Sequence, residues 1–400
     1  MDLSFTPAEL AFREEVRHFF RTEIPEKIRD KVLEGRHLTK DEIITSQRIL
    51  NARGWAVPNW PKEWGGQGWS PVQVYMYQDE MQQAGVPSPL GFNTSMVGPV
   101  IAHFGTQAQK ERFLPRAANL DDWWCQGFSE PGAGSDLASL RTKAERVGDT
   151  WVINGQKTWT TMAQYADWIF VLCRTDANAK KQEGISFILC DMKTKGVTVR
   201  PIQTIDGGHE VNEVFFDDVV VPAENLVGQM NRGWDCAKFL LGNERTGIAR
   251  VGTSKARLKR IRELATLERV GDEALIKDKR FREKLAAVEI ELKALEMTQL
   301  RIVADERRRE KGKPNPASSI LKLKGSVIQQ ATTELMLEVA GPFAMPYVEQ
   351  DRAEGRNEPG IGPDFAAGAA PTYFNWRKIS IYGGSNEIQR NIVAKAILGF

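Results

Sequence analysis

A short segment rich in glycine and small polar residues is the first part of the chain that could bind a ligand. It runs from Phe128 to Asp136 and reads FSEPGAGSD. Small residues at the start of a β-rich region leave backbone N–H groups open to a phosphate or to the edge of a flavin. The spacing matches neither the GxGxxG dinucleotide fingerprint nor a P-loop. Taken alone, an ordinary glycine-rich turn is the simpler interpretation.

Glu244 is the second candidate for chemistry. It lies in the run FLLGNERTGIAR, residues 239–250, whose apolar spacing predicts a helix. On one helix its carboxylate would share a face with four apolar side chains, those of Leu240, Leu241, Ile248 and Val251. Burial raises the pKa of a glutamate toward neutrality, where it can act as a general base. A structural ion pair is the alternative role.

The third candidate segment is IYGGSNEIQR, residues 381–390, near the end of the chain. Two glycines and Ser385 precede a helical pattern, so Ser385 is predicted to cap the helix. The start of that helix could face an anionic or polar ligand. A plain capped helix explains the pattern equally well.

Three regions must position these segments. Residues 1–122 read as helical, with Thr6 and Pro7 predicted to start a helix over residues 8–21. Residues 123–231 contain short β-rich runs separated by turns such as Asn154-Gly155, a pattern typical of an antiparallel barrel or sandwich. The predicted strands cover residues 151–153, 168–173, 185–190, 197–202 and 213–221.

Residues 232–400 return to a helical pattern. The spacing of Leu285, Val288, Leu292 and Leu295 predicts one apolar stripe in a helical bundle. Pro314 to Pro316 would end that helix, and Ser318 or Ser319 could cap the next one. The predicted fold class is therefore α+β, mainly α: a helical domain, a β-barrel and a helical bundle.

Composition excludes several functions. The 400 residues carry 54 Lys and Arg against 52 Asp and Glu, a net charge of +2, which argues against binding to nucleic acid. No apolar run is long enough to span a bilayer, and the first residues do not resemble a signal peptide. Four scattered cysteines and four scattered histidines indicate neither a disulfide framework nor a metal site. We therefore expect a cytoplasmic protein without a bound metal.

Several motifs together resemble the acyl-CoA dehydrogenase family along nearly the whole chain. In order they are WPKEWGGQGWSP, FGTQAQKERFLP, FSEPGAGSD, INGQKTWTT, EVFFDDVVVPAENLVG and YGGSNEIQRNIVAK. The resemblance implies an N-terminal helical domain, a middle β-barrel and a C-terminal four-helix bundle with FAD at their junction. It also implies α,β-dehydrogenation of an acyl-CoA thioester, with electrons passed to an electron-transferring flavoprotein.

The resemblance assigns roles to matching positions in the flavin site. Gln126, Phe128 and Ser129 match residues that meet the isoalloxazine ring, and Gly134 and Ser135 follow on the pyrophosphate side. Four further positions match residues that contact the flavin: Trp159, Thr161, Ser385 and Glu387. Substrate contacts are expected at Ser135, Tyr382 and Gly383.

The catalytic base departs from the commonest family pattern. Many members carry it directly after the tyrosine of the C-terminal motif, but here Gly383 follows Tyr382 and cannot accept a proton. The branch typified by isovaleryl- and long-chain acyl-CoA dehydrogenases places a glutamate on a helix, before a family arginine. Glu244 and Arg245 match that placement, with Glu387 as the second choice for the base.

Two other departures predict an unlike partner subunit. The usual Arg-Lys-x-Phe-Gly segment is absent from RELATLERVGDEALIKDKRF, and the usual Gln-x-x-Gly-Gly is replaced by LEVAG at Leu337 to Gly341. In the family these segments complete the FAD site of the neighbouring subunit. We therefore expect a second, small acyl-CoA dehydrogenase-like subunit and an α2β2 assembly.

The expected substrate is a medium-chain acyl-CoA. Within the family, the sequence is similar to large subunits of pimeloyl-CoA dehydrogenases, which act on dicarboxylyl-CoA thioesters. A branched or steroid side-chain thioester is an alternative substrate, because Gly242 and Gly247 flank Glu244 and leave room for bulk. Two further candidate functions are a non-catalytic scaffold subunit and a flavin monooxygenase or nitroalkane oxidase of the same fold.

Overall fold

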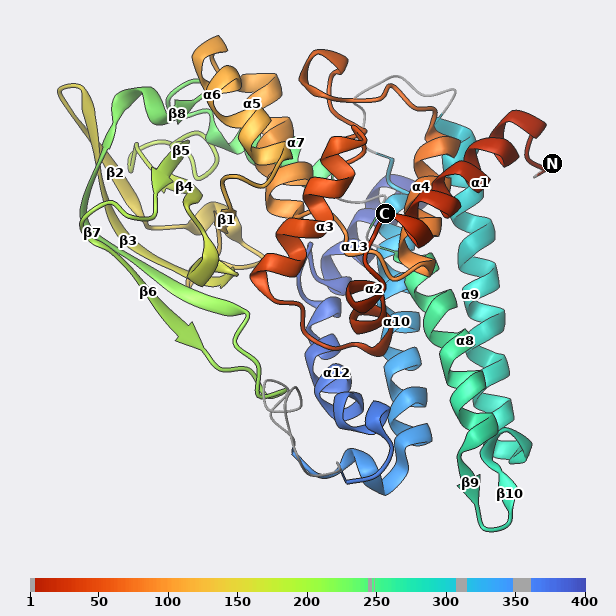
Figure 1. Ribbon diagram of the computed structural model, residues 1–400. Coiled ribbons are helices and arrows are strands. Elements are labelled where there is room, and N and C mark those ends of the chain that lie inside the picture. Colours follow the sequence, from red (N-terminus) through yellow and green to blue (C-terminus); the bar gives the residue numbers. More distant parts are fainter. Residues whose placement is uncertain (1–3, 244–246, 248, 307–314, 348–360) are drawn as a thin grey trace.

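The computed structural model describes residues 4–243, 247, 249–306, 315–347 and 361–400. In the sequence, N-terminal helices and a C-terminal helical bundle precede and follow a middle region built on one sheet. In space the sheet lies at one side of the molecule, with N-terminal helices such as α3 and α5 between it and the C-terminal bundle (Figure 1). The predicted order of helices, β region and helices is confirmed. Within the described ranges, no helix combines the length and apolar character that crossing a bilayer requires.

The N-terminal helices begin at well-formed caps. Thr6, Thr39, Ser70 and Thr106 each accept a hydrogen bond from the backbone N–H three residues later, and the Glu or Gln side chain there accepts one from the backbone N–H of the cap. The predicted helix start at Thr6-Pro7 is confirmed. The helices are α1 (Pro7–Thr22), α2 (Glu26–Glu34), α3 (Lys40–Ala52), α4 (Pro71–Gln83), α5 (Gly98–Phe104) and α6 (Gln107–Ala118), with a π-helical turn at Phe92–Val97 before α5.

The middle region forms an eight-stranded sheet with the order β6-β7-β3-β2-β4-β5-β8, in which β1 also pairs with β4. All five predicted strands are present. The strands are β1 (Trp124–Gly127), β2 (Lys143–Val147), β3 (Thr150–Thr161), β4 (Trp168–Arg174), β5 (Ile185–Asp191), β6 (Val197–Ile202), β7 (Val211–Pro222) and β8 (Leu226–Val227).

The predicted antiparallel barrel is wrong in two respects. The sheet is open, because β6 and β8 end the strand order and the described residues contain no pairing between them. Strand β8 is only two residues long, which is too short to close a barrel. In addition, β4 runs parallel to both β1 and β2.

The C-terminal region is a bundle whose apolar stripe matches the prediction. Leu285, Leu292 and Leu295 of α9 are buried in one core, and Val288 packs against it. The elements are α7 (Gly233–Asn243), α8 (Val251–Leu267), a hairpin of β9 (Arg269–Val270) and β10 (Glu273–Ala274), α9 (Lys279–Glu306), α10 (Ser318–Ala340), α12 (Ala369–Asn375), the 3₁₀ turn η9 (Trp376–Ser380), α13 (Asn386–Val393) and a π turn at Ala394–Leu398.

Two local predictions in this region are wrong. Ala317, not Ser318 or Ser319, is the N-cap of α10; the Ser318 hydroxyl instead donates to the Asn315 carbonyl from inside the first turn. The helix predicted over residues 239–250 is also interrupted. Arg250 has a φ of 46°, a left-handed conformation that a right-handed helix cannot contain, and α8 begins after it.

The interruption removes part of the argument for Glu244. Val251 belongs to α8 and so does not share a helix face with Leu240 of α7. Glu244, Arg245 and Ile248 lie outside the described residues. Leu240 is fully buried, as its predicted inward orientation requires.

Candidate active site

The glycine-rich segment is held in place by a buried ion pair. Lys157 of β3 is completely buried, and its Nζ donates to Glu130 Oε1 at 2.8 Å and to the Phe128 carbonyl at 3.1 Å. The other Glu130 oxygen accepts the backbone N–H of Arg141 at 2.7 Å. Burial alone would raise the pKa of Glu130, but the Lys157 charge and these hydrogen bonds hold it below its usual value. The segment is therefore fixed to the sheet by charge.

The predicted flavin-contacting residues divide into buried anchors and open surface. Phe128 is buried edge-on against Phe170 and Phe187, so its side chain belongs to the core. Gln126 and Ser129 are partly exposed, and Gly134 and Ser135 are exposed. A methyl group added at Gly134 would meet no atom within 4 Å, so the backbone there is open to a ligand.

Trp159 presents a flat apolar surface beside this segment. Its φ of 59° is left-handed, and its side chain is 60% exposed although it lies within β3. The preceding residue, Thr158, donates its backbone N–H to the Ser129 carbonyl at 2.9 Å, which places Trp159 next to the open segment. An exposed indole beside an open glycine-rich backbone fits a flat aromatic ring that carries phosphates. Thr161, two residues later, is partly exposed.

The C-terminal motif is organised by its helix cap and by α10. Ser385 accepts the backbone N–H of Ile388, which confirms the predicted N-cap. Asn386 is buried, and its Oδ1 accepts from Lys322 Nζ at 2.8 Å. Gly383 and Gly384 have φ values of 65° and 80°, and the side-chain amide of Gln389 donates to both of their carbonyls.

Contacts at the domain junction connect the β region to α12 and η9, the elements that precede the C-terminal motif. Met162, just after Thr161, donates its backbone N–H to the Glu210 carbonyl at 2.7 Å. The Glu210 carboxylate forms an ion pair with Lys378 of η9, and Asn375 donates to Asp206 Oδ2 at 3.0 Å. Because η9 leads directly to Tyr382, the β region and the C-terminal motif meet at one junction.

A cavity of about 530 Å³ lies at this junction. Its wall includes Met162, Ser95 of the π-helical turn, and Trp376 of η9. Arg250 and Arg257 both stack on Trp376, with guanidinium carbons 5.7 and 4.3 Å from the ring centre. Desolvation, followed by the Arg250 charge, lowers the pKa of Arg257 to about 10, so it remains charged at neutral pH. The cavity therefore favours an anionic ligand.

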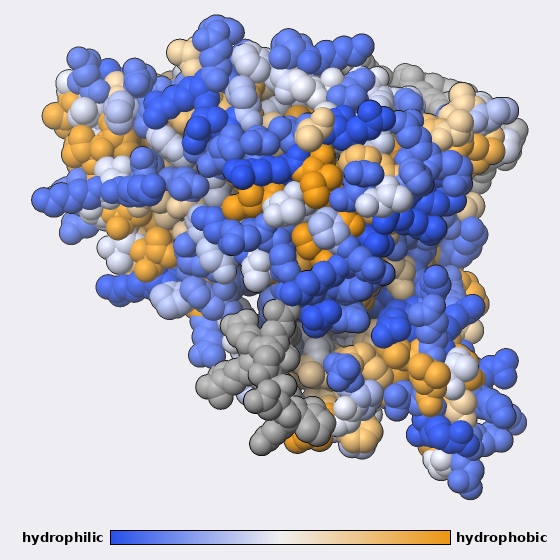
Figure 2. All heavy atoms as spheres, in the orientation of Figure 1, coloured by the Kyte–Doolittle hydropathy of each residue, from blue (hydrophilic) through white to orange (hydrophobic). Residues whose placement is uncertain are grey.

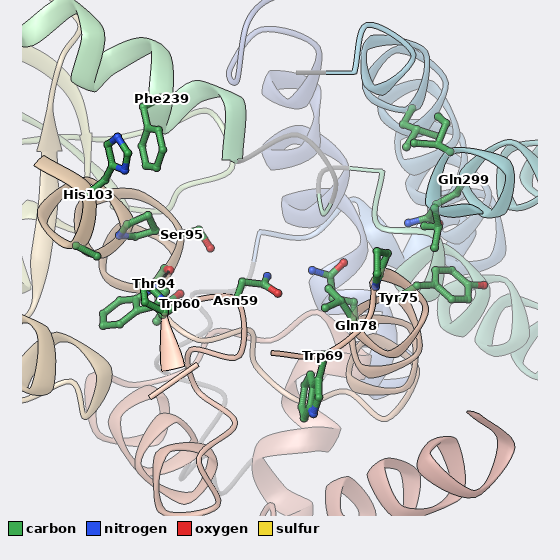
Figure 3. Close-up of a pocket in the computed structure, with 18 residues that line it drawn as sticks. Asn59, Trp60, Trp69, Tyr75, Gln78, Thr94, Ser95, His103, Phe239 and Gln299 are labelled. Atoms are coloured by element: carbon green, nitrogen blue, oxygen red, sulfur yellow. Dashed lines mark hydrogen bonds between the residues drawn. The ribbon is translucent and has the colours of Figure 1, made fainter. Parts of the chain in front are cut away.

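A second cavity, of about 670 Å³, shares Ser95 with the first. It lies between the N-terminal helices, α7, α9 and α10, and Figure 3 shows the residues around it. The wall is mainly apolar; it includes the aromatic residues Trp60, Trp69, Tyr75 and Phe239 and the amides Gln78 and Gln299. Its volume is in the range of pockets that hold drug-sized ligands.

Sequence reasoning missed this second cavity. Its wall comes from five separated stretches of sequence, within residues 59–78, 94–103, 239, 299–303 and 321, and among these the motif WPKEWGGQGWSP does not by itself indicate a cavity. The one available signal was Trp60 and Trp69 in the Gly/Pro/Trp-rich stretch before α4, which could equally be core residues.

The structure describes the surroundings of one candidate base, Glu387, and only the neighbours of the other, Glu244. Glu387 is exposed; a hydrogen bond from its own backbone N–H, and next one from the Ser385 hydroxyl, lower its pKa. A lowered pKa makes a carboxylate a weaker proton acceptor. Glu244 lies outside the described residues, but Phe239 of α7 lines the larger cavity, and a methyl group added at Gly247 would lie 3.8 Å from Gln78 in the same wall.

Family models match the chain in three consecutive parts. They describe the N-terminal domain of acyl-CoA dehydrogenases over residues 6–121, the middle domain over 125–219 and the C-terminal domain over 231–398. The chain belongs to the acyl-CoA dehydrogenase family. Membership makes it an oxidoreductase enzyme. Among the residues that the structure describes, no group of His, Cys, Asp and Glu side chains could hold a metal ion.

Individual acyl-CoA dehydrogenases are similar over most of the chain. Acyl-CoA dehydrogenase IpdE1 of Mycobacterium tuberculosis is 37% identical, covering 88% of this chain and 86% of that protein. A chain in the ChsE4-ChsE5 complex from Mycobacterium tuberculosis is 31% identical with a TM-score of 0.83, covering 100% and 99% of the two chains. A chain of the Tcur3481-Tcur3483 steroid ACAD is 30% identical with a TM-score of 0.84 at the same coverage.

Proposed function

We propose that this enzyme is an FAD-dependent dehydrogenase of bulky, ring-containing acyl-CoA thioesters, with steroid-derived acyl groups as the leading class. Its product would be the trans-2-enoyl-CoA. The observation that carries the proposal is the pair of cavities sharing Ser95: one is bordered by arginines at the domain junction, and the other is large, mainly apolar and partly aromatic. Such a pair suits a ligand with an anionic nucleotide part and a bulky apolar part.

The open segment and Trp159 would hold the cofactor. Ser129, Gly134 and Ser135 offer exposed polar and backbone groups beside the exposed indole, and we assign Gln126, Phe128, Trp159, Thr161, Ser385 and Glu387 to the same site on the family resemblance. When bound, FAD supplies the acceptor for the β-hydride. The Arg250 and Arg257 charges suit a diphosphate, a group that FAD and coenzyme A share.

Glu244 would remove the α-proton of the substrate. The flanking contacts support this role, because Phe239 and the Gln78 neighbour of Gly247 belong to the wall of the large cavity. Arg245 is assigned to the catalytic pair on the resemblance alone. Tyr382 and Gly383 remain proposed substrate contacts at the junction, together with Ser135.

The cavity wall supports a bulky neutral acyl group over a dicarboxylate. An ω-carboxylate needs a cationic partner when it is buried. Among the described residues that line the large cavity there is no lysine or arginine. A dicarboxylyl-CoA, the substrate implied by the resemblance to pimeloyl-CoA dehydrogenases, is therefore the second candidate. The similarity to a steroid ACAD supports the bulky, ring-containing acyl-CoA as the first candidate.

The natural assembly would contain a second, unlike subunit and donate electrons to an electron-transferring flavoprotein. One segment that departs from the family pattern runs from the last turns of α8 to the start of α9, and the other ends α10. α8 and α10 finish at the same end of the bundle (Figure 1). The relative in the ChsE4-ChsE5 complex is likewise one of two different proteins. These observations support an α2β2 assembly in which the partner completes the FAD site.

The test of catalysis is Glu244→Gln, which keeps the side-chain shape and removes the proton acceptor. We expect unchanged FAD and acyl-CoA binding and a kcat about 10²- to 10⁴-fold lower, the usual loss on removing a general base. Anaerobic bleaching of the flavin by acyl-CoA measures the step directly. Glu111→Gln, at an exposed position of α6, is the matched control and should retain activity. Glu387→Gln tests the second candidate: if it alone abolishes bleaching while FAD stays bound, Glu387 is the base.

The test of assembly is expression of the chain alone and together with its candidate small subunit. We expect stoichiometric FAD and turnover only in the co-expressed complex. A fully active homo-oligomer with one FAD per chain would contradict the unlike partner. A complex whose turnover is unaffected by Glu244→Gln and Glu387→Gln would point to a non-catalytic scaffold subunit.

A further inference from the structure

The large cavity contains a buried amide oxygen without a hydrogen-bond partner. Gln299 of α9 is 8% exposed, it lines the cavity, and its Oε1 is buried with no partner in the described structure. Leaving a buried polar group unpaired costs about 1–3 kcal/mol. A group kept at that cost in a cavity wall is suited to pairing with a ligand.

The surrounding polar groups do not need Gln299. One helical turn earlier on α9, Glu296 forms an ion pair with Lys255 and another with Lys293. The Tyr75 hydroxyl, also in the cavity wall, donates to Glu296 Oε1 at 3.4 Å. This network is complete without the Gln299 amide, so the amide is not explained by the packing of α4, α8 and α9.

Gln299 lies far from the side on which the two cavities meet. Ser95 lines both cavities, and Figure 3 shows Ser95, His103 and Phe239 across the large cavity from Gln299 and Tyr75. An acyl-CoA whose nucleotide part occupies the arginine-bordered cavity would therefore extend its distal end toward Gln299.

The geometry points to Gln299 as a specificity residue that recognises a neutral oxygen at the distal end of the acyl group. This inference rests on the proposed function and adds the chemistry of the substrate's far end. A carboxamide can donate to a keto oxygen or, after a half-turn, accept from a hydroxyl. A carboxylate fits less well, because no lysine or arginine is present among the described residues of this wall.

The test compares two ring-containing acyl-CoA thioesters that differ only in a distal keto or hydroxyl group. The wild-type complex should prefer the oxygenated thioester by about tenfold to a hundredfold in kcat/KM, as expected where a site is built to pair a substrate oxygen. In Gln299→Leu the preference should fall to within about twofold, mainly because kcat/KM for the oxygenated thioester decreases. The melting temperature should be kept or raised, because the variant removes an unpaired buried group.

Gln107→Leu, the same change at an exposed position of α6, is the matched control and should leave the preference intact. An unchanged preference in Gln299→Leu, or an equal loss for both thioesters, would overturn the inference. If neither thioester is dehydrogenated, the proposed function fails, and calorimetric binding of the same pair to wild type and variant still tests Gln299 separately.

Discussion

The two segments assigned to the flavin are anchored in different ways. The glycine-rich segment Phe128–Ser135 is fixed within its own domain by the Lys157–Glu130 ion pair, in which opposite charges compensate each other during burial. The C-terminal segment Tyr382–Glu387 is fixed across the bundle by Lys322, whose ammonium donates to the neutral amide of Asn386. Burial lowers the pKa of Lys322 to about 8, although the Glu387 charge opposes the shift.

One half of the proposed site is therefore anchored within its own domain by an ion pair, and the other is anchored across the bundle by a contact that depends on helix packing and on pH. A buried charge with an opposite charge beside it is stable once formed, but removing one partner is costly. A buried ammonium paired with an amide is only partly compensated, so its protonation responds to the surroundings.

The largest effect should come from breaking the charged anchor. Lys157→Met leaves Glu130 buried without its counter-charge and should lower the free energy of unfolding by about 3–5 kcal/mol. In the co-expressed complex, FAD should be lost from the variant on gel filtration at temperatures where the wild-type complex retains it. Denaturant unfolding measures the first effect, and Lys143→Met, at an exposed position of β2, is the control. Exposed ion pairs contribute about 1 kcal/mol or less. If the variant's unfolding free energy lies within about 1 kcal/mol of the wild-type value, the ion pair does not anchor the segment.

A smaller effect, with a distinct pH dependence, should come from the other anchor. Lys322→Met should lower the free energy of unfolding by about 1 kcal/mol at neutral pH, because a lost hydrogen bond is partly offset by no longer burying a charge. The folded pKa of Lys322 is about 8, below its ordinary value of 10.5, so the unfolded chain binds more protons between these values. Wild-type stability should therefore rise relative to the variant from pH 8 to pH 10.5. Parallel stability curves for the two proteins over this range would contradict the prediction.

The smallest effect is expected at the junction between the two halves. Lys378 and Glu210 are 32% and 28% exposed, so solvent weakens their ion pair. Glu210→Gln should cost about 0.5–1 kcal/mol. A double-mutant cycle with Lys378→Gln measures the coupling. A coupling energy near zero would mean that the Asn375–Asp206 hydrogen bond and packing alone hold the junction.

Most of the fold could be predicted from local sequence. Capping residues such as Thr6 and short β-rich runs between turns encode elements through neighbouring residues, and these predictions were confirmed. Closure of the sheet depends on strand lengths and on pairing between distant segments, which periodicity does not report. The break at Arg250 is a backbone conformation that no residue type in FLLGNERTGIAR required.

The candidate site was predictable where family motifs carry it and not elsewhere. Ser385 as a cap and the open segment around Gly134 follow from residue types that favour these conformations. Gln299 could not be found, because its significance depends on a missing hydrogen-bond partner and on a cavity formed by distant helices. Both the missing partner and the cavity are defined only by contacts between residues far apart in the sequence.

The open sheet has a further consequence for association between molecules. A free strand edge presents unpaired backbone groups that can recruit a strand from another chain. At one edge, β6 carries Arg200 and Pro201, a charged side chain and a residue without a backbone N–H donor. At the other edge, β8 offers only two residues. Figure 2 shows hydrophilic and hydrophobic side chains interspersed over the visible face of this region. Both edges are thus poor templates for strand addition, and we expect the open sheet to recruit few strands from other molecules.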